Sequence, residues 1–359
     1  MALHFTQTRW ETLRQTYARW WARSLDRPVI KLMVADAFSP EREMPRAPFL
    51  SQANCHDFSY TPEEVIDRID YELSKKEFLG DAFPIMRMDC FGPGVLAAFC
   101  GARLDNSSGG VWFFPEEALP LSEITVRYDP ENRWVKRIKT LYAAGHARWQ
   151  GTVLMGMPDL GGVLDVAATF RGSENLLMDL YDDPDEVLRL CGEIEVAWMD
   201  AYRDFMQILA PINPGCSNWH GVYSEKPCYI PQSDFSYMIG NDMFRQFTLP
   251  SLKQVCRDIP HTIYHLDGIG QLAHLDDVLS IEALNAVQWV YGDGQPGTLH
   301  WLEVYKKIAA AEKGICVEGS CEEFAALAAR FNKNLYFTRE VPHDRLDAAW
   351  AVLKPFIQA

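Results

Sequence analysis

Short apolar runs and amphipathic stretches alternate along the second half of the chain. In the amphipathic stretches, apolar residues recur every three or four positions, as they do along one face of a helix. This spacing predicts helices at 134–149, 185–209, 242–257, 299–311, 321–331 and 345–356. The short apolar runs are bounded by turn-forming residues and predict buried strands at 152–156, 262–265, 286–290, 315–317 and 335–337.

The first half of the chain is less regular. Residues 1–27 read as a helical extension rich in Trp and Arg, 28–35 as a buried strand and 62–78 as a helix. Residues 81–127 combine Gly, Pro and short apolar pieces, which indicates an excursion from the main fold. We therefore expect one domain over residues 1–359, with an N-terminal helical extension.

Strands that alternate with helices through short links favour parallel strands and crossover helices. The predicted fold class is α/β, a TIM-like (β/α)8 barrel. A doubly wound sheet would give the same alternation. The barrel is preferred because no Gly-rich dinucleotide turn follows the first strand and because the repeats continue to the C-terminus.

Composition narrows the possible partners. The chain has 359 residues and a formal charge of −15, which argues against nucleic acid or an anionic membrane surface. There is no membrane-length apolar run and no signal-peptide pattern at residues 1–20, so a cytoplasmic protein is expected. Nine cysteines without a CxxC motif indicate reduced thiols. A small-molecule ligand is the expected partner.

In a barrel, functional side chains lie at the C-terminal ends of the strands. The sharpest pair here is His265 and Asp267, which follow a predicted strand two positions apart and so point to one face. An imidazole and a carboxylate suit Zn²⁺ or a similar ion. Glu340, after the last strand, is the predicted third ligand. A core-bound His265 with a turn-capping Asp267 is the alternative.

Other polar residues at strand ends are weaker candidates. His220 follows a Trp in a loop and has either a catalytic or a packing role. Asp234 is a candidate acid or a helix N-cap. Arg171 can bind a substrate carboxylate or pair with an acidic residue. The chain has no GxSxG, Walker or HExxH motif, which leaves serine-hydrolase, nucleotide-binding and zincin functions without support.

Three segments carry a family resemblance. They are 83–96, which ends in Phe-Gly-Pro-Gly-Val-Leu, 170–184, which begins Phe-Arg-Gly-Ser-Glu-Asn, and 264–268, Tyr-His-Leu-Asp-Gly. They resemble the uroporphyrinogen decarboxylase superfamily, and the resemblance runs from about residue 28 to the end. It implies a TIM-like barrel with an N-terminal helical extension. It also implies one of two chemistries: cofactor-free decarboxylation, or methyl transfer that involves zinc, thiols and corrinoid proteins.

The sequence departs from both patterns of the superfamily. The decarboxylases have Arg-Gln-Ala-Gly-Arg where this chain has residues 31–37, Lys-Leu-Met-Val-Ala-Asp-Ala, so both arginines are missing. The thiol-activating methyltransferases have Cys at the position of Asp267, and a later Cys near Glu340. Carboxylates in place of thiolates keep a three-ligand site and make the bound ion more Lewis acidic.

These departures lead to one functional hypothesis. The protein is a metal-assisted methyltransferase that demethylates a small, possibly O-methyl, substrate, with a corrinoid on a partner protein as acceptor. His265, Asp267 and Glu340 bind the metal, and His220 or Asp234 donates a proton. Trp219, Tyr237, Trp289 and Arg171 contact the substrate. The main alternative is a cofactor-free lyase related to uroporphyrinogen decarboxylase; a binding protein and a hydrolytic metalloenzyme also remain open.

Overall fold

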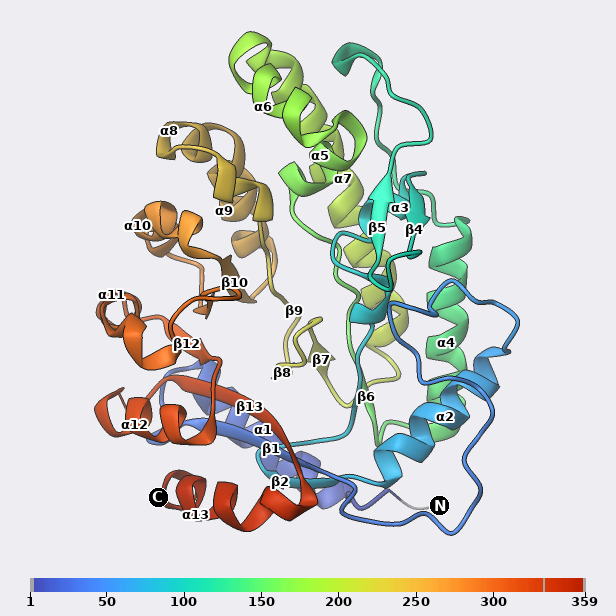
Figure 1. The fold of residues 1–359 in the computed structure, drawn as a ribbon, viewed down its shortest axis with the longest axis vertical. Helices are drawn as coiled ribbons and strands as arrows, with labels where there is room; N and C mark the ends of the chain where they lie inside the picture. Colours follow the sequence, from blue (N-terminus) through green and yellow to red (C-terminus); the bar gives the residue numbers. More distant parts are fainter. Residues whose placement is uncertain (1–2, 332, 358–359) are drawn as a thin grey trace.

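The computed structural model describes residues 3–331 and 333–357 and has the predicted alternation of strands and helices (Figure 1). The C-terminal half follows the hydrophobic pattern closely. Its strands are β10 (His261–Asp267), β11 (Ala286–Val290), β12 (Gly314–Val317) and β13 (Leu335–Pro342). Its helices include α9 (Leu249–Asp258), α10 (Leu275–Leu279), α11 (Leu302–Ala310), α12 (Cys321–Phe331) and α13 (Leu346–Ile357).

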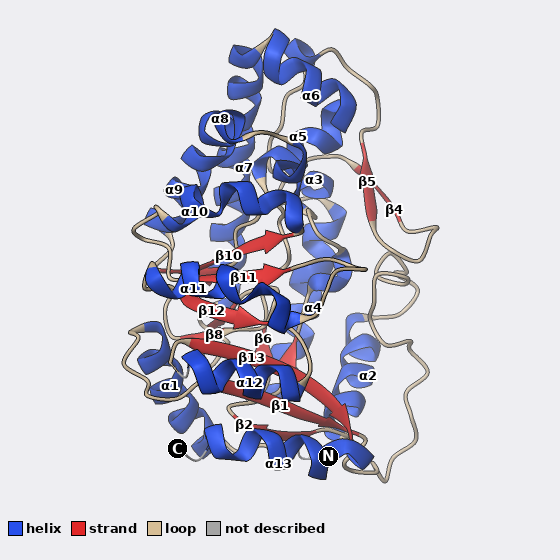
Figure 2. Cartoon of the chain, turned by 60° about the vertical axis from the view of Figure 1, so that its left-hand side comes forward, coloured by secondary structure: helices blue, strands red, loops and turns tan. Residues whose placement is uncertain are grey.

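A seven-stranded, mostly parallel sheet forms the centre of the molecule. Its order is β2-β1-β13-β12-β11-β10-β9, with β1 at Val29–Ala35, β2 at Glu77–Gly80 and β9 at Cys228–Tyr229. Only β2 runs antiparallel to its neighbour. Figure 2 shows these strands stacked, with α11, α12 and α13 along their outer side. Most residues of β1, β11 and β12 are buried, as expected for parallel strands against which helices pack.

The remaining strands are very short. β3 (Ile85–Met86) pairs in parallel with β6 (Leu154–Met155), while the pairs β4 (Arg103–Asp105) with β5 (Trp112–Phe114) and β7 (Cys216–Ser217) with β8 (Tyr223–Ser224) are antiparallel. Backbone pairing among the described residues thus forms four sheets, and no closed barrel is hydrogen-bonded. The mixed α/β arrangement is consistent with a TIM-like fold. The predicted excursion at 81–127 contributes β3 to the parallel pairing.

Two of the longer helices begin at residues whose side chains cap the N-terminus. α2 (Pro62–Ser74) has a capping box between Thr61 and Glu64, and α4 (Arg133–Trp149) is capped by Asn132. α7 (Pro184–Leu209) starts with proline and buries one apolar stripe. Shorter helices complete this part of the chain: α3 (Leu96–Phe99), α5 (Val163–Arg171) and α6 (Ser173–Asp182).

Two predicted helices differ from the observed elements. α2 ends at Ser74 because the following residues pair with β1 as β2. The helix predicted at 242–257 is divided into α8 (Asn241–Met243), a π-helical turn at 244–248 and α9. Pro250 lacks an N–H and its ring crowds the preceding turn, and the wide π turn immediately before it accommodates this.

The N-terminal helix α1 (Gln7–Trp21) packs beneath the strands. The indole of Trp10 donates to the carbonyl of Thr152 just before β6, at 3.1 Å, and the hydroxyl of Tyr17 donates to the carbonyl of Asp81 before β3, at 3.3 Å. α1 therefore covers the N-terminal ends of these strands, and their C-terminal ends face the opposite side. None of the helices in the described ranges combines the length and apolar character needed to cross a membrane.

Candidate metal centre and adjoining cavity

Asp234, His265 and Asp267 bring three ligand atoms within 4.8 Å of one another. The Nε2 atom of His265 lies 3.8 Å from Oδ2 of Asp267, so the prediction that this pair shares one face of β10 is confirmed. Asp234 begins the 3₁₀ helix η3 (Asp234–Met238). One imidazole and two carboxylates fit a divalent ion, and an ion bound by three protein ligands keeps an open position.

Strand pairing brings Asp234 to this place. The segment that follows β9 continues beside β10, where the amide of His265 donates to the carbonyl of Pro231 at 3.0 Å. The half-buried carboxylate of Asp165 accepts from the backbone amides of Asp234 and Phe235, at 3.1 and 2.7 Å. Asp165 therefore fixes the start of η3. The side chain of Asp234 contributes its carboxylate oxygen to the cluster with His265 and Asp267.

A hydrogen-bonded chain orients His265. Its Nδ1 lies 2.9 Å from Oε1 of Gln288, and Nε2 of Gln288 donates to Oε1 of Glu318 at 3.0 Å. Because an ionised carboxylate only accepts hydrogen bonds, the amide nitrogen of Gln288 must face Glu318 and its oxygen must face His265. The ring of His265 then carries its proton on Nδ1, which leaves the Nε2 lone pair directed to the acidic residues.

The electrostatic environment of the cluster is acidic. Desolvation, followed by the charges of Asp165 and Asp267, raises the pKa of Asp234 well above its usual range. Burial raises the pKa of the nearby Asp159 to about 7. Burial also lowers the pKa of His265, against the opposing effects of Gln288 and Asp267. A bound divalent cation would offset the repulsion among the carboxylates and would favour a neutral imidazole as ligand.

Two of the three aromatic residues predicted to line the pocket lie near this cluster. Trp219 packs edge-on against the ring of His265, with centroids 5.2 Å apart, and its indole donates to a backbone carbonyl. Tyr237 is 51% exposed. A Cβ added to Gly268 or Gly270 would lie only 2.8–3.0 Å from atoms of its ring. Both glycines thus leave room for the ring of Tyr237.

The third aromatic residue, Trp289, lies elsewhere. It is fully buried and packs against Trp301, with ring centroids 5.3 Å apart. Side chains alternate along a strand, so β11 directs Gln288 to the site and its neighbour Trp289 to the other face. The structure therefore brings Gln288, which the sequence analysis did not single out, to His265 and moves Trp289 away from it.

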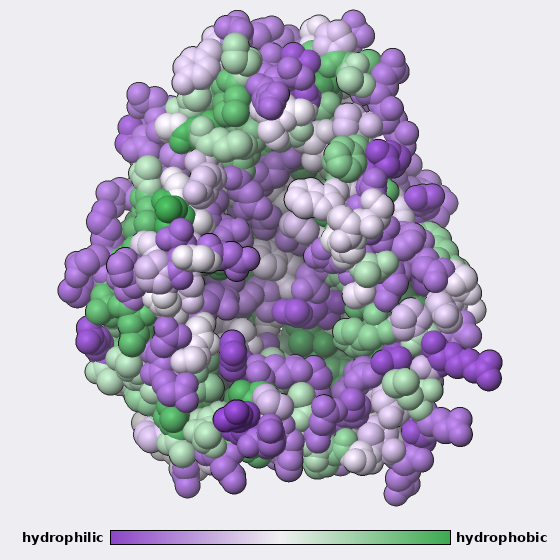
Figure 3. Space-filling model, in the orientation of Figure 1, coloured by the Kyte–Doolittle hydropathy of each residue, from purple (hydrophilic) through white to green (hydrophobic). Residues whose placement is uncertain are grey.

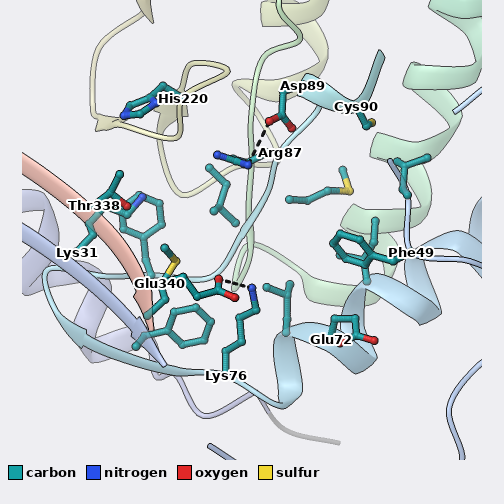
Figure 4. Close-up of a pocket in the computed structure, with 18 of the residues that line it drawn as sticks. Lys31, Phe49, Glu72, Lys76, Arg87, Asp89, Cys90, His220, Thr338 and Glu340 are labelled. Carbon is teal, nitrogen blue, oxygen red and sulfur yellow. Dashed lines mark hydrogen bonds and ion pairs between the residues drawn. The ribbon is translucent and has the colours of Figure 1, made fainter. Parts of the chain in front are cut away.

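Two further predicted site residues are engaged in ion pairs outside the cluster. Arg171, at the end of α5, holds both carboxylate oxygens of Asp179, at 2.5 and 3.2 Å. Glu340, on β13, accepts from Nζ of Lys76 at 2.6 Å (Figure 4). The structure thus groups Asp234, and not Glu340, with His265 and Asp267.

A cavity of 480 Å³ lies between β1, β13, the end of β3 and α2. The face drawn in Figure 3 is hollowed at its centre, with hydrophilic residues along much of the rim. His220 lines this cavity and also connects it to the cluster, since its Nδ1 lies 3.4 Å from Nε2 of Gln288. Burial, with Arg87 and Lys31 nearby, lowers the pKa of His220 to about 3, so its ring is neutral.

Comparison with known proteins gives structural similarity without a match to any sequence family. The sequence matches no protein-family model and no curated protein. Among solved structures, the chain is similar to a methyltransferase from Methanosarcina mazei, with a TM-score of 0.63 and 12% sequence identity. The similarity covers 96% of this chain and 98% of that chain. At this identity the comparison establishes a shared fold over the whole length.

Proposed function

We propose that this protein is a metal-dependent methyltransferase that removes a methyl group from a small O-methyl compound. The observation that carries the proposal is the convergence of Asp234, His265 and Asp267 at the C-terminal end of β10. The fold shared with a methyltransferase supports this class of reaction. We further propose that a corrinoid on a partner protein accepts the methyl group.

The three ligands would hold Zn²⁺ or a similar divalent ion, which supplies a Lewis acid for an oxygen leaving group. Their chemistry supports this choice, since carboxylates in place of thiolates favour polarisation of oxygen over activation of a thiol. Gln288 and Glu318 keep the Nε2 lone pair of His265 free for the ion. Trp219 restricts the rotation of the His265 ring by edge-on packing.

Two roles are refined relative to the sequence-based hypothesis. Asp234 is proposed as a ligand, and its raised pKa makes it a proton donor only when no cation is bound. His220, whose Nδ1 accepts from Gln288, has its Nε2–H available to donate a hydrogen bond to substrate. With a pKa of about 3 it is neutral, which suits a hydrogen-bond donor more than a general acid.

Metal analysis and single-turnover methyl transfer test the proposal. The purified protein is supplied with Zn²⁺, desalted and assayed for bound metal by mass spectrometry. It is then mixed with methoxybenzene and reduced cobalamin, and methylcobalamin formation is followed by absorbance. We expect one bound ion per chain and metal-dependent methylcobalamin formation. Protein that retains no metal above a chelator-treated control would overturn the proposal.

A cofactor-free lyase is the second candidate, and the state of Asp234 favours it. A carboxylic acid whose pKa is raised by desolvation and by neighbouring carboxylates stays protonated near neutral pH. Such a group can deliver a proton to the carbanion that decarboxylation leaves. Release of carbon dioxide from uroporphyrinogen by chelator-treated protein would favour this function over methyl transfer.

A further inference from the structure

Strand β1 carries one charged residue within a buried apolar run. Its sequence is Val-Ile-Lys-Leu-Met-Val-Ala, and the charged residue, Lys31, is only 2% exposed. Lys31 lines the 480 Å³ cavity, with Thr338 of the neighbouring strand beside it (Figure 4). A charge inside a parallel sheet is costly unless a partner compensates for it, so its surroundings indicate its role.

The ammonium group of Lys31 has neutral partners only. Its Nζ donates to the carbonyl of Gly221 at 2.7 Å and lies 4.0 Å from the centre of the Phe83 ring. In the part of the chain that the structure describes, no carboxylate forms an ion pair with it. Burial and the positive charge of Arg87 lower its pKa to about 7.

Two other cationic side chains of the cavity, Lys76 and Arg87, form ion pairs. Lys76 binds Glu340 at 2.6 Å, and Arg87 contacts Asp89 at 3.2 Å, as the dashed lines in Figure 4 show. Arg87 is about half-exposed, so its guanidinium keeps free donors on the cavity side. An anion beside Lys31 would therefore meet one unpaired ammonium and one guanidinium with donors to spare.

A glycine keeps open the space between these two cations. Gly221 has φ +87°, a conformation that favours glycine. A Cβ at this position would lie 3.7 Å from both Nζ of Lys31 and Cδ of Arg87. Lys31 and Arg87 therefore flank the same small volume, and residue 221 places no side chain in this volume because it is a glycine.

The rest of the cavity limits what the anion can be attached to. Its walls include Met33, Ile69, Leu73, Phe78, Ile85 and Met86, which suit an apolar body. A carboxylate matches an ammonium and a guanidinium with a single charge and two oxygens, whereas a phosphate dianion would need more donors. A substrate cation, such as a quaternary amine, would be repelled by the same pair.

We propose that Lys31 and Arg87 bind the carboxylate of a small, otherwise apolar substrate in this cavity. His220 lies between this anion site and the cluster, because it lines the cavity and its Nδ1 accepts from Gln288. The substrate's opposite end can then point toward His265. The position of the reacting methyl group rests on the proposed function, whereas binding of the carboxylate does not.

Calorimetry on the full-length, chelator-treated protein tests the anion site without metal or methyl acceptor. The probes are benzoate, its neutral isostere benzamide, and inorganic phosphate. We expect benzoate to bind at least about tenfold more tightly than benzamide, as a charge-assisted contact predicts. Equal binding of benzoate and benzamide, or tighter binding of phosphate, would overturn the proposal.

Variants locate the site. Lys31→Met should weaken benzoate binding at least about tenfold, and Arg87→Gln, at a half-exposed position, by a smaller factor. The matched control is Lys313→Met, because Lys313 is also a buried lysine that donates to backbone carbonyls but lies outside the cavity. If Lys31→Met does not fold, unchanged benzoate affinity in Arg87→Gln alone refutes the paired site. Loss of metal binding with intact benzoate selectivity would instead refute only the proposed function.

Discussion

The Nδ1 atom of His265 lies 2.9 Å from Oε1 of Gln288, and this contact leaves Nε2 as the nitrogen that can bind a cation. Gln288→Met removes the acceptor while keeping the length of the side chain. We expect Zn²⁺ affinity to fall about 10- to 100-fold, since the tautomer of His265 is no longer fixed. Competition with a chromogenic chelator measures it. Gln271→Met is the control, because this buried glutamine instead accepts from Tyr264; an equal loss there would contradict the prediction.

The ligand set can be tested by comparing two carboxylates. Asp234→Asn should reduce Zn²⁺ affinity at least about tenfold, because an amide oxygen carries no charge to attract the ion. Glu340→Gln should leave it nearly unchanged, since Glu340 pairs with Lys76. Isothermal titration with Zn²⁺ distinguishes the two variants. The reverse result would restore the ligand set predicted from the sequence.

The buried ammonium of Lys31 predicts a dependence of stability on pH. Its pKa is about 7 in the folded protein and near 10.5 in the unfolded chain, so between these values the unfolded state binds more protons. The contribution of Lys31 to the free energy of unfolding therefore rises with pH over this range, by about 1.4 kcal/mol per pH unit. Below pH 7 the charged form is buried at a cost, and Lys31→Met should be the more stable protein.

Urea unfolding of wild type and Lys31→Met at pH 7, 8 and 9 measures this difference. The advantage of the variant should shrink as the pH rises. Over this pH range His220 is neutral, and burial raises the pKa of the neighbouring Tyr336 well above its usual value, so neither group produces the trend. Stability curves that run parallel would show that Lys31 is not desolvated.

Two glycine substitutions should change stability in opposite directions. Gly221→Ala places a Cβ on a residue with φ +87°, only 3.3 Å from Ile85, and should destabilise the protein by about 1–2 kcal/mol. Gly192→Ala, at an exposed position of α7 with no atom within 4 Å of the new Cβ, should stabilise it by up to about 1 kcal/mol. Chemical denaturation compares both with wild type. The same sign for both changes would contradict the assigned backbone constraint.

Short apolar runs and a helical spacing of apolar residues were sufficient to predict the long elements. The predicted strand at 286–290 and helix at 321–331 coincide with β11 and α12. The spacing of His265 and Asp267 correctly placed both on one face of β10. The strand predicted at 152–156 contains β6, whereas β3, β7, β8 and β9 have two residues each, too few to show a pattern.

Strand register determines which residues lie beside His265, and the sequence does not specify that register. Gln288 reaches His265 because these two residues are register partners in β10 and β11. Asp234 joins the cluster because residues 231–232 pair beside His265 and Asp165 fixes the following turn. Lys31 was detectable in principle, as a charge within an apolar strand, but its lack of an acidic partner required the structure.

Gly268 and Gly270 contribute no functional group, yet the ring of Tyr237 occupies the space that their side chains would fill. One half-exposed ring thus spans the segment after β10 and the helix η3 that carries Asp234. Exposed side chains change rotamer in picoseconds to nanoseconds, far faster than a backbone loop opens. Rotation of this side chain can therefore move the ring without a change in the backbone, whereas a larger residue at either glycine would displace the ring, because a Cβ there would lie within 3.0 Å of it.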